Sequence, residues 1–420
     1  MIVIGTIFGS IFGGIQSQMF GRKITMLSAI GLFISGMSCI RFGSHYAFLL
    51  FGQFLMGFSS SYLACAVPSY NSEISQPQMR KLSGTFYTTF FSLGGALMFL
   101  FTAIFHIRTS MIIVLVMASS NFILMLFCPK SPSWLLNKGR QQDAFEVLKR
   151  IRGCEEVARV ELDRLKENKK KQALSMEKSG EENKKVERIL NSVKQSSFLK
   201  PLFVLMSIFL FGLQLSGATS LPIYFIPFLN KTGVVTVFDP YWAASTLTLW
   251  RVCVNVMATL VASRVKRRPL LIFAGLFCAI GWFMTGLSTY FYEHEYFEDY
   301  ESILPWFTYI SFGVTITGYA SGFVMVLFML LGELLPSNLR GLGIGIVLSF
   351  NNTAWFLMVF LFPKILSSFG TGGTFFAMSG MTFFVVTLIY FIVPETLGRT
   401  LENIESHYRK EKNVDENEIL

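Results

Sequence analysis

The chain has 420 residues, of which 52% are hydrophobic and only 15% charged, and 44 of them are phenylalanine. Apolar runs of about 20 residues recur along nearly its whole length, and each is long enough to cross a bilayer. This composition excludes an ordinary soluble protein and predicts an all-α, polytopic membrane protein. The formal net charge of +10 is therefore attributed to basic loops on the cytoplasmic side rather than to a nucleic-acid site.

Eleven apolar spans are predicted, five before a long polar loop at 129–200 and six after it. They cover residues 2–20, 24–40, 46–68, 82–105, 109–128, 201–224, 241–263, 270–290, 304–331, 341–366 and 371–393. The chain is then expected to divide into an N-terminal helical bundle at 1–128, a cytoplasmic linker at 129–200, a C-terminal six-helix bundle at 201–393 and a cytoplasmic tail at 394–420.

Lys and Arg set the predicted orientation, because loops rich in these residues stay on the cytoplasmic side. They gather in alternate short loops, where the bases include Arg22, Arg80, Arg264, Arg268 and Arg340. The intervening loops hold few bases, and one of them carries the acidic stretch YEHEYFEDYE at 292–301. The basic loops, the linker and the tail are therefore predicted to be cytoplasmic.

Two charged motifs each occur twice. Glu73 and Arg80 stand near the end of one span, Glu333 and Arg340 stand at the same spacing near the end of another, and QMFGRK at 18–23 is matched by SRVKRRP at 263–269. Matching motifs in the same order indicate a duplicated membrane protein. Only 17 residues precede Gln18, whereas a full span precedes the matching motif in the second half. The repeat therefore predicts that the first helix of the N-terminal half is missing from this chain.

The linker begins with a pattern typical of an amphipathic helix, since Ala144, Val147, Leu148 and Ile151 recur at helical spacing. Its later, Lys/Glu-rich part is expected to be solvated. Asn230 opens the sequon Asn230-Lys231-Thr232 in a predicted outside loop, which makes it a candidate glycosylation site. The six cysteines are scattered and the four histidines isolated, so neither a disulfide nor a metal site is predicted.

Five stretches together resemble a known family. They are GGIQSQMFGRK, PSYNSEISQPQMRK, PKSPSWLLNKGRQQDAFEVLKRIRG, GLQLSGATSLPIYF, and GELLPSNLRG with the terminal PETLGRTLENIE. The chain is similar to the sugar porters of the major facilitator superfamily, above all to insect-type facilitated trehalose and glucose transporters. The resemblance implies two six-helix bundles around a central sugar site. It also implies facilitated, alternating-access transport of a hexose or trehalose across the plasma membrane, without a cofactor and without enzymatic chemistry.

The resemblance also implies which residues contact sugar. Gln214, Ser216 and Tyr224 match the family's seventh-helix motif, whereas Leu213 replaces the first of its paired glutamines and Thr219 stands where an Asn is usual. Thr88 occupies the position of a glutamine in the fifth helix, and Asn351, Asn352 and Trp355 are further candidates for polar and stacking contacts. Amides, hydroxyls and aromatic faces suit a sugar because its hydroxyls both donate and accept. Packing in the core remains the alternative for each of these residues.

The repeated cytoplasmic charges are interpreted as a latch between the two bundles. Glu73, Arg80, Glu333 and Arg340, with the bases Arg22, Arg264 and Arg268, are expected to close the inner face in the outward-open state. Arg suits this role because its planar fork can hold a carboxylate or cap helix-end carbonyls. The alternative is ordinary charges that snorkel at the membrane boundary.

Arg251 lies near the centre of the span at 241–263, where the family usually carries a neutral amide. A charge at that depth is costly unless it faces a cavity or a partner. We therefore expect Arg251 to face the central cavity and to meet water, hydroxyls or an anionic substrate, and the alternative is that backbone carbonyls hold it. The departures from the family pattern also leave two other functions open, a ligand sensor that does not transport and a carrier of a small organic anion.

Overall fold

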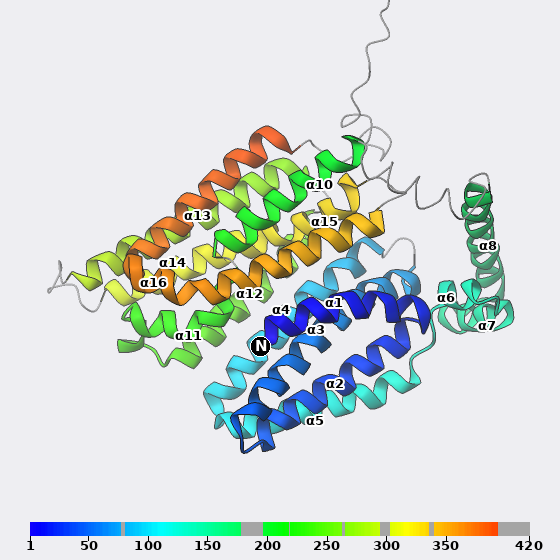
Figure 1. The fold of residues 1–420 in the computed structure, drawn as a ribbon, viewed down its shortest axis with the longest axis horizontal. Coiled ribbons are helices and arrows are strands. Elements are labelled where there is room, and N and C mark those ends of the chain that lie inside the picture. The colour runs from blue at the N-terminus through cyan, green and yellow to red at the C-terminus, as the bar shows by residue number, and fades with distance from the viewer. Residues whose placement is uncertain are drawn as a thin grey trace, which may run out of the picture. The chain divides into compact units, whose positions relative to one another are not determined.

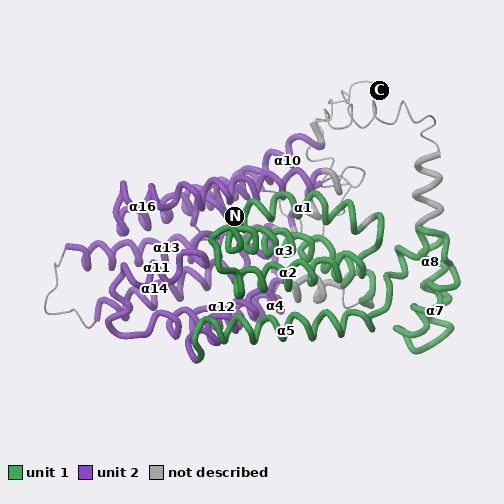
Figure 2. The backbone as a smooth tube through the Cα atoms, turned by 60° about the horizontal axis from the view of Figure 1, so that its bottom comes forward, with its two compact units in different colours: residues 1–87, 105–189 green, residues 88–104, 190–420 purple. Residues whose placement is uncertain are grey.

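The computed structural model describes residues 1–76, 80–177, 196–217, 219–262, 265–294, 303–335 and 340–393, and every regular element in these ranges is a helix. The chain forms two compact units (Figure 2). Unit 1 comprises residues 1–87 and 105–189, and unit 2 comprises residues 88–104 and 190–420.

Unit 1 contains the first apolar helices and the helices of the linker (Figure 1). The former are α1 (Ile2–Met19), α2 (Arg22–Phe42), α3 (Tyr46–Ile74), the start of α4 (Arg80–Ile104) and α5 (Ile107–Phe127). The latter are α6 (Pro132–Asn137), α7 (Gln141–Arg152) and α8 (Glu155–Glu177). The amphipathic helix predicted in the linker is confirmed as α7, because Ala144 and Leu148 are buried in a small core with residues of α6 and α8.

Glycine allows α1 and α3 to pack with their backbones in contact. A Cβ added at Gly57 of α3 would lie 1.8 Å from the carbonyl oxygen of Ile2, and one at Gly5 of α1 would lie 2.1 Å from that of Phe54. Close approach of this kind favours helix association in lipid. The hydrophobic effect does not drive helices together there, so van der Waals packing between small residues does.

Unit 2 contains the second part of α4 and all the later helices. These are α10 (Ser196–Phe209), the π-helix η1 (Leu210–Leu215), α11 (Leu221–Lys231), the short η2 (Val234–Thr236), α12 (Pro240–Ala262), α13 (Arg267–Glu293), α14 (Leu304–Gly318), the π-helix η4 (Tyr319–Phe323), α15 (Val324–Leu334) and α16 (Arg340–Ile392). Their core is built from large apolar side chains, among them Trp282, Phe323 and Phe375, which are fully buried.

Helix breaks in unit 2 modify the predicted spans. The span expected at 201–224 is wrong as one continuous helix, because η1 ends at Leu215 and α11 begins only at Leu221, with Gly217 in the left-handed region (φ 75°). A second glycine, Gly370 (φ 70°), divides α16 into the two spans predicted from the sequence. The Glu293 side chain accepts a hydrogen bond from the backbone N–H of Thr371 (3.2 Å) and so caps the helix that follows this break.

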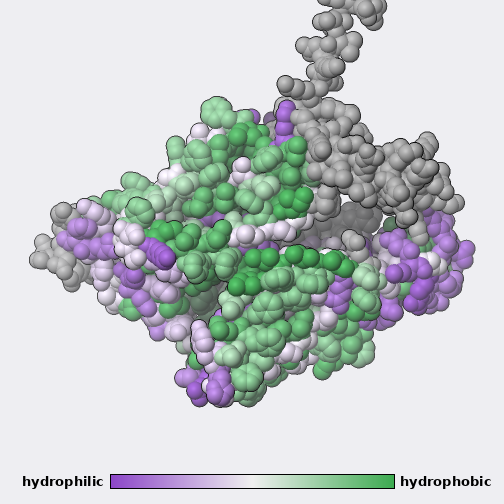
Figure 3. All heavy atoms as spheres, in the orientation of Figure 1, coloured by the Kyte–Doolittle hydropathy of each residue, from purple (hydrophilic) through white to green (hydrophobic). Residues whose placement is uncertain are grey.

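Eight helices in the described residues are long and apolar enough to cross a membrane, and two shorter apolar helices, Ile2–Ser17 and Thr88–Ile104, accompany them. Large apolar side chains on these helices are exposed, for example Phe127 at 72%. In Figure 3, hydrophobic residues cover much of the visible surface of the apolar helices, whereas hydrophilic residues gather over α6–α8. The protein is a multi-pass membrane protein.

Candidate functional site

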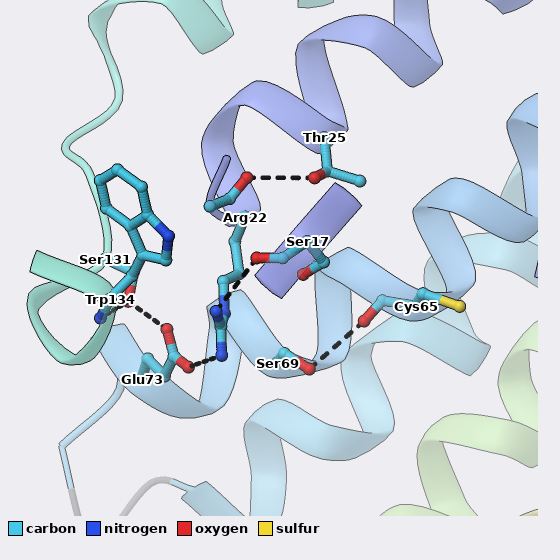
Figure 4. A network of polar contacts seen from close by, with 9 residues as sticks. Ser17, Arg22, Thr25, Cys65, Ser69, Glu73, Ser131 and Trp134 are labelled. Atoms are coloured by element: carbon cyan, nitrogen blue, oxygen red, sulfur yellow. Dashed lines mark hydrogen bonds and ion pairs between the residues drawn. The ribbon is translucent and has the colours of Figure 1, made fainter. Parts of the chain in front are cut away.

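A charged cluster joins three helices of unit 1 (Figure 4). Arg22, the first residue of α2, forms an ion pair with Glu73 in the last turn of α3 (2.9 Å), and the side chains are only 19% and 15% exposed. Arg22 also donates to the carbonyl oxygen of Ser17 in the last turn of α1 (3.2 Å). One guanidinium therefore fixes the α1–α2 turn against the end of α3.

Ser131 connects this cluster to the linker. Its hydroxyl donates to the second carboxylate oxygen of Glu73, and its oxygen accepts the backbone N–H of Trp134 (3.2 Å) as the N-cap of α6. The Trp134 ring covers Gly21, where an added Cβ would lie 2.9 Å from the indole. Both oxygens of Glu73 are therefore occupied by partners from unit 1.

A second arginine attaches the linker to the same end of α3, and the sequence interpretation missed it. Arg152, at the end of α7, is held by Glu161 of α8 through two hydrogen bonds (2.7 and 3.0 Å) and donates to the carbonyl oxygen of Ile74 (2.8 Å). Its side chain is 5% exposed. The signal available in the sequence was an arginine directly before Gly153, the glycine that ends α7.

Two further bases occupy matching positions of the repeated motif. Lys23 donates to the carbonyl oxygen of Leu126, near the end of α5 (2.7 Å). Arg268 donates to the carbonyl oxygen of Tyr390, near the end of α16, and lies over the Tyr390 ring at 5.1 Å. In each half, the base therefore caps the C-terminal end of that half's last apolar helix, where a positive charge is favoured by the helix dipole.

The other members of the predicted latch are not placed. The side chains of Arg80, Arg264, Glu333 and Arg340 lie outside the part of the chain that the structure describes. A latch between the two halves therefore stays a prediction, and the base that pairs with Glu73 among the described residues is Arg22 of its own unit.

The predicted sugar contacts of the seventh-helix motif form a polar chain within unit 2. The Gln214 amide donates to the Asn351 side chain (2.7 Å), and its oxygen accepts the Thr219 hydroxyl (2.7 Å). Gln214 is 1% exposed, and both the nitrogen and the oxygen of its amide bind other residues of the protein. Thr219 lies in the break between η1 and α11, and the chain therefore crosses from one side of that break to α16.

Ser216 and Tyr224 are bound to the backbone instead. The buried Ser216 hydroxyl donates to the carbonyl oxygen of Gly212 (2.5 Å). The Tyr224 hydroxyl donates to the carbonyl oxygen of Val359 (2.9 Å), and its ring stacks on Phe362 with centroids 4.8 Å apart. Tyr224 thus links α11 to α16 through both ends of its side chain.

The remaining predicted sugar contacts differ in their hydrogen-bond partners. Asn351 joins the polar chain, whereas Asn352 and Trp355 lie half-buried elsewhere on α16, and the indole N–H of Trp355 has no partner among the described residues. Thr88 begins the part of α4 that belongs to unit 2. One turn later, Ser92 accepts a hydrogen bond from Asn255 of α12 (2.8 Å), a polar contact that the sequence did not indicate.

Arg251 lies half-buried in the middle of α12, over the ring of Tyr319 at 5.0 Å. The two residues line a small cavity between α11, α12 and the α14–η4 junction. A charge at the centre of a membrane-spanning helix costs about 3 kcal/mol. A cation–π contact contributes only about 0.5–2 kcal/mol. The ring therefore offsets only part of the cost, and the Nε of Arg251 is buried without a partner among the described residues.

The comparison with known families decides what the chain is. The sequence pattern of the family described as "Sugar (and other) transporter" matches residues 1–408.

The chain belongs to this sugar transporter family.

Curated members of the family resemble the chain along most of its length. The facilitated trehalose transporter Tret1 of Aedes aegypti is 26% identical over 397 residues, which cover 94% of this chain and 47% of that protein. Tret1 of Culex quinquefasciatus is 27% identical and covered to 74%, and Tret1 of Drosophila pseudoobscura pseudoobscura is 28% identical and covered to 44%. The chain thus spans about half the length of two of these relatives.

Solved structures of a xylose transporter are similar to the structure of this chain. The inward-open xylose transporter XylE from E. coli gives a TM-score of 0.76 at 20% identity, over 97% of this chain and 87% of that one. Its partially occluded inward-open form gives 0.75 at 19% identity, over 95% and 87%. The chain therefore shares the fold of these structures, in line with the fold that the family resemblance implies.

The glycosylation sequon lies in a different setting from the one expected. Asn230 was predicted in a loop, but it is the penultimate residue of α11, where its side chain is exposed. Thr232 of the same sequon is 1% exposed, and its hydroxyl donates to the carbonyl oxygen of Phe228 (2.9 Å). The loop placement was therefore wrong, since the hydrophobic face of α11 continues to Leu229. Glycosylation at Asn230 stays a prediction.

Proposed function

We propose that the protein carries a hexose or trehalose across the plasma membrane by facilitated, alternating-access transport. Membership of the sugar transporter family over residues 1–408 supports this proposal, as does the similarity to facilitated trehalose transporters over 94% of the chain. It requires no cofactor and no covalent chemistry.

The polar chain Thr219–Gln214–Asn351 is the observation that carries the proposal. It lies where the helix formed by α10 and η1 breaks before α11. Discontinuous helices form the substrate sites of many transporters, because the break releases polar groups inside an otherwise apolar bundle. Neutral amides and hydroxyls that already bind one another can exchange these hydrogen bonds for sugar hydroxyls at little net cost.

The cluster around Glu73 supplies the second part of the proposal. A carrier that works by alternating access needs contacts on its inner face that form in one state and break in the other. Arg22 and Ser131 each bind a carboxylate oxygen of Glu73, and Arg22 also binds the carbonyl oxygen of Ser17, so the cluster joins helix ends of unit 1. We propose that this cluster sets the position of the end of α3, and with it the ability of the inner face to open.

Radiolabelled uptake in cells that lack their own sugar carriers tests the proposal. Saturable uptake of glucose or trehalose is expected, and Gln214→Ala should reduce it roughly tenfold, the order expected when hydrogen bonds to a polar substrate are lost. Gln141→Ala, at an exposed position at the start of α7, is the matched control and should leave uptake unchanged. Surface biotinylation corrects each rate for the amount of protein at the membrane.

The outcomes separate the candidate functions. Absence of uptake for both sugars, with the protein at the cell surface, would overturn the transport proposal. If the sugars raise the thermal stability of the purified protein in that case, a ligand sensor that does not transport is the better description.

A further inference from the structure

The cavity beside Arg251 is small and its lining is mainly apolar. Leu221, Pro222, Phe225 and Ile316 line it with apolar side chains, and Arg251, Thr248 and Tyr319 are the lining residues that also carry polar groups. All of these residues belong to unit 2. Low-polarity walls strengthen any charge–charge attraction inside the cavity, because they exclude the water that would screen it.

The polar groups of this cavity are mainly hydrogen-bond donors. A guanidinium has five N–H donors and no acceptor. The Thr248 hydroxyl is already committed, since it donates to the carbonyl oxygen of Ala244 (2.7 Å). A ligand group that fits Arg251 must therefore offer acceptors, and a carboxylate is a group that only accepts and can receive two parallel N–H donors from one guanidinium.

The positive charge of Arg251 has no described counter-charge in its own unit. The acids of unit 2 whose side chains the structure describes are Asp239 and Glu293, and both are engaged elsewhere. Asp239 accepts the backbone N–H of Tyr241 (2.9 Å) at the start of α12, roughly 18 Å from Arg251 along the helix at 1.5 Å per residue. Glu293 accepts the N–H of Thr371. An anion bound in the cavity would supply the missing charge.

We infer that Arg251 receives the carboxylate of an acidic sugar, so that the substrate class includes uronates or other monosaccharides bearing a carboxylate. This inference rests on the proposed function, sugar transport. A neutral hexose suits Arg251 less well, because a hydroxyl in place of the carboxylate has no negative charge and brings a hydrogen that itself needs an acceptor. The ring of Tyr319 holds the guanidinium in place, and the N–H donors of Arg251 then bind the carboxylate edge.

Glucose and glucuronate are the sharpest pair of probes, since they differ only in having a hydroxymethyl group or a carboxylate at one carbon. Binding to the purified full chain is measured by ligand-induced thermal stabilisation and by competition for uptake. The wild-type protein should bind glucuronate roughly tenfold more tightly than glucose, the order expected for charge-assisted hydrogen bonds. Arg251→Gln should remove this preference, and Arg251→Lys should retain part of it.

Arg41→Gln is the matched control variant. Arg41 also lies over an aromatic ring, that of Phe42 at 5.1 Å, and its Nε is likewise buried without a partner among the described residues. It stands at the end of α2, remote in sequence from the cavity. The control should keep the glucuronate preference, which shows that loss of any buried arginine is not sufficient to remove it.

The possible results of these binding and uptake measurements lead to different conclusions. Glucose uptake without a glucuronate preference, or a preference that survives Arg251→Gln, overturns the acidic-sugar inference and leaves sugar transport standing. Benzoate serves as a carboxylate that is not a sugar, and tighter binding of benzoate than of glucuronate would overturn the assignment to sugars. If none of the three ligands binds and neither glucose nor trehalose is taken up, the inference and the proposed function fail together.

Discussion

Arg22 and Glu73 form an ion pair of 2.9 Å between the first residue of α2 and the last turn of α3. The two residues belong to two different motifs of the N-terminal half, Arg22 to QMFGRK and Glu73 to PSYNSEISQPQMRK. Their pairing gives a physical reason for the presence of both motifs in one half, because a charge at each helix end neutralises the other where water is partly excluded.

Glu73→Gln should destabilise unit 1. The amide keeps the size of the side chain and can still accept from Ser131, but it leaves Arg22 without its opposite charge. Since both side chains are mostly buried, the loss should be about 1–2 kcal/mol, between the values for surface and buried pairs. A thermal-shift measurement on the purified protein checks this.

Asp163→Asn provides the comparison for that measurement. Asp163 pairs with Lys166 at 3.6 Å, and its side chain is 75% exposed, so its loss should change stability by less than about 0.5 kcal/mol. Equal shifts for the two variants would contradict the role given to Glu73.

Arg152→Ala should release the linker helices from the end of α3. Arg152 is almost fully buried and binds both Glu161 and the carbonyl oxygen of Ile74, so its removal leaves a buried acid and a buried carbonyl unpaired. We expect local opening of α7 and α8 to become easier by about 2 kcal/mol, which is roughly 30-fold in amide exchange rate. Hydrogen–deuterium exchange measures this directly.

The exposed Arg150, two positions earlier in the same helix, provides the control for this experiment. Arg150→Ala should leave the exchange rates of α7 and α8 unchanged. Arg152→Lys should be intermediate, because it keeps the charge but loses the planar fork. Unchanged exchange in Arg152→Ala would show that the apolar core of the linker helices alone holds them in place.

The apolar runs predicted the positions of the helices. A segment that crosses lipid must satisfy its backbone hydrogen bonds internally, so a long apolar run indicates a helix. The apolar runs did not predict the break between Leu215 and Leu221, because the segments before and after it are as apolar as those of an unbroken span. Gly217 and Pro222 were local signs of the break. Fold class was thus accessible from the sequence, whereas helix interruptions depended on packing.

The candidate site was accessible only in part. The motif identified Gln214 and Thr219, which bind each other at the break, but it could not decide which of two adjacent asparagines joins them. Successive helical residues point about 100° apart, so the choice of Asn351 depends on the register of α16. The partners of Arg152 were equally inaccessible, because they lie on α3 and α8.

Cys154 should be the most reactive thiol toward a water-soluble alkylating agent among the described cysteines. It is exposed directly before α8, and hydrogen bonds from the backbone N–H groups of Val157 and then Glu156 lower the pKa of its thiol. A lowered pKa raises the thiolate fraction at a given pH, so the alkylation rate should reach half its maximum below the pH found for a free cysteine. Mass spectrometry after brief labelling checks the site.

Cys154→Ser should remove that rapid labelling and leave the slow labelling of the other cysteines. Cys278 is an internal reference, because it is fully buried and should react only after unfolding. Rapid labelling that persists in Cys154→Ser would show that another thiol carries the reactivity.

Gly57→Ala should severely destabilise unit 1, whereas Gly31→Ala should not. The added methyl at Gly57 would lie 1.8 Å from the carbonyl oxygen of Ile2, and the backbone of α1 can yield only by moving away from α3. At Gly31 of α2 nothing lies within 4 Å of an added Cβ, and alanine favours a helix over glycine by about 1 kcal/mol. Opposite shifts in melting temperature are therefore expected, and a similar melting temperature for both variants would mean that α1 and α3 tolerate separation.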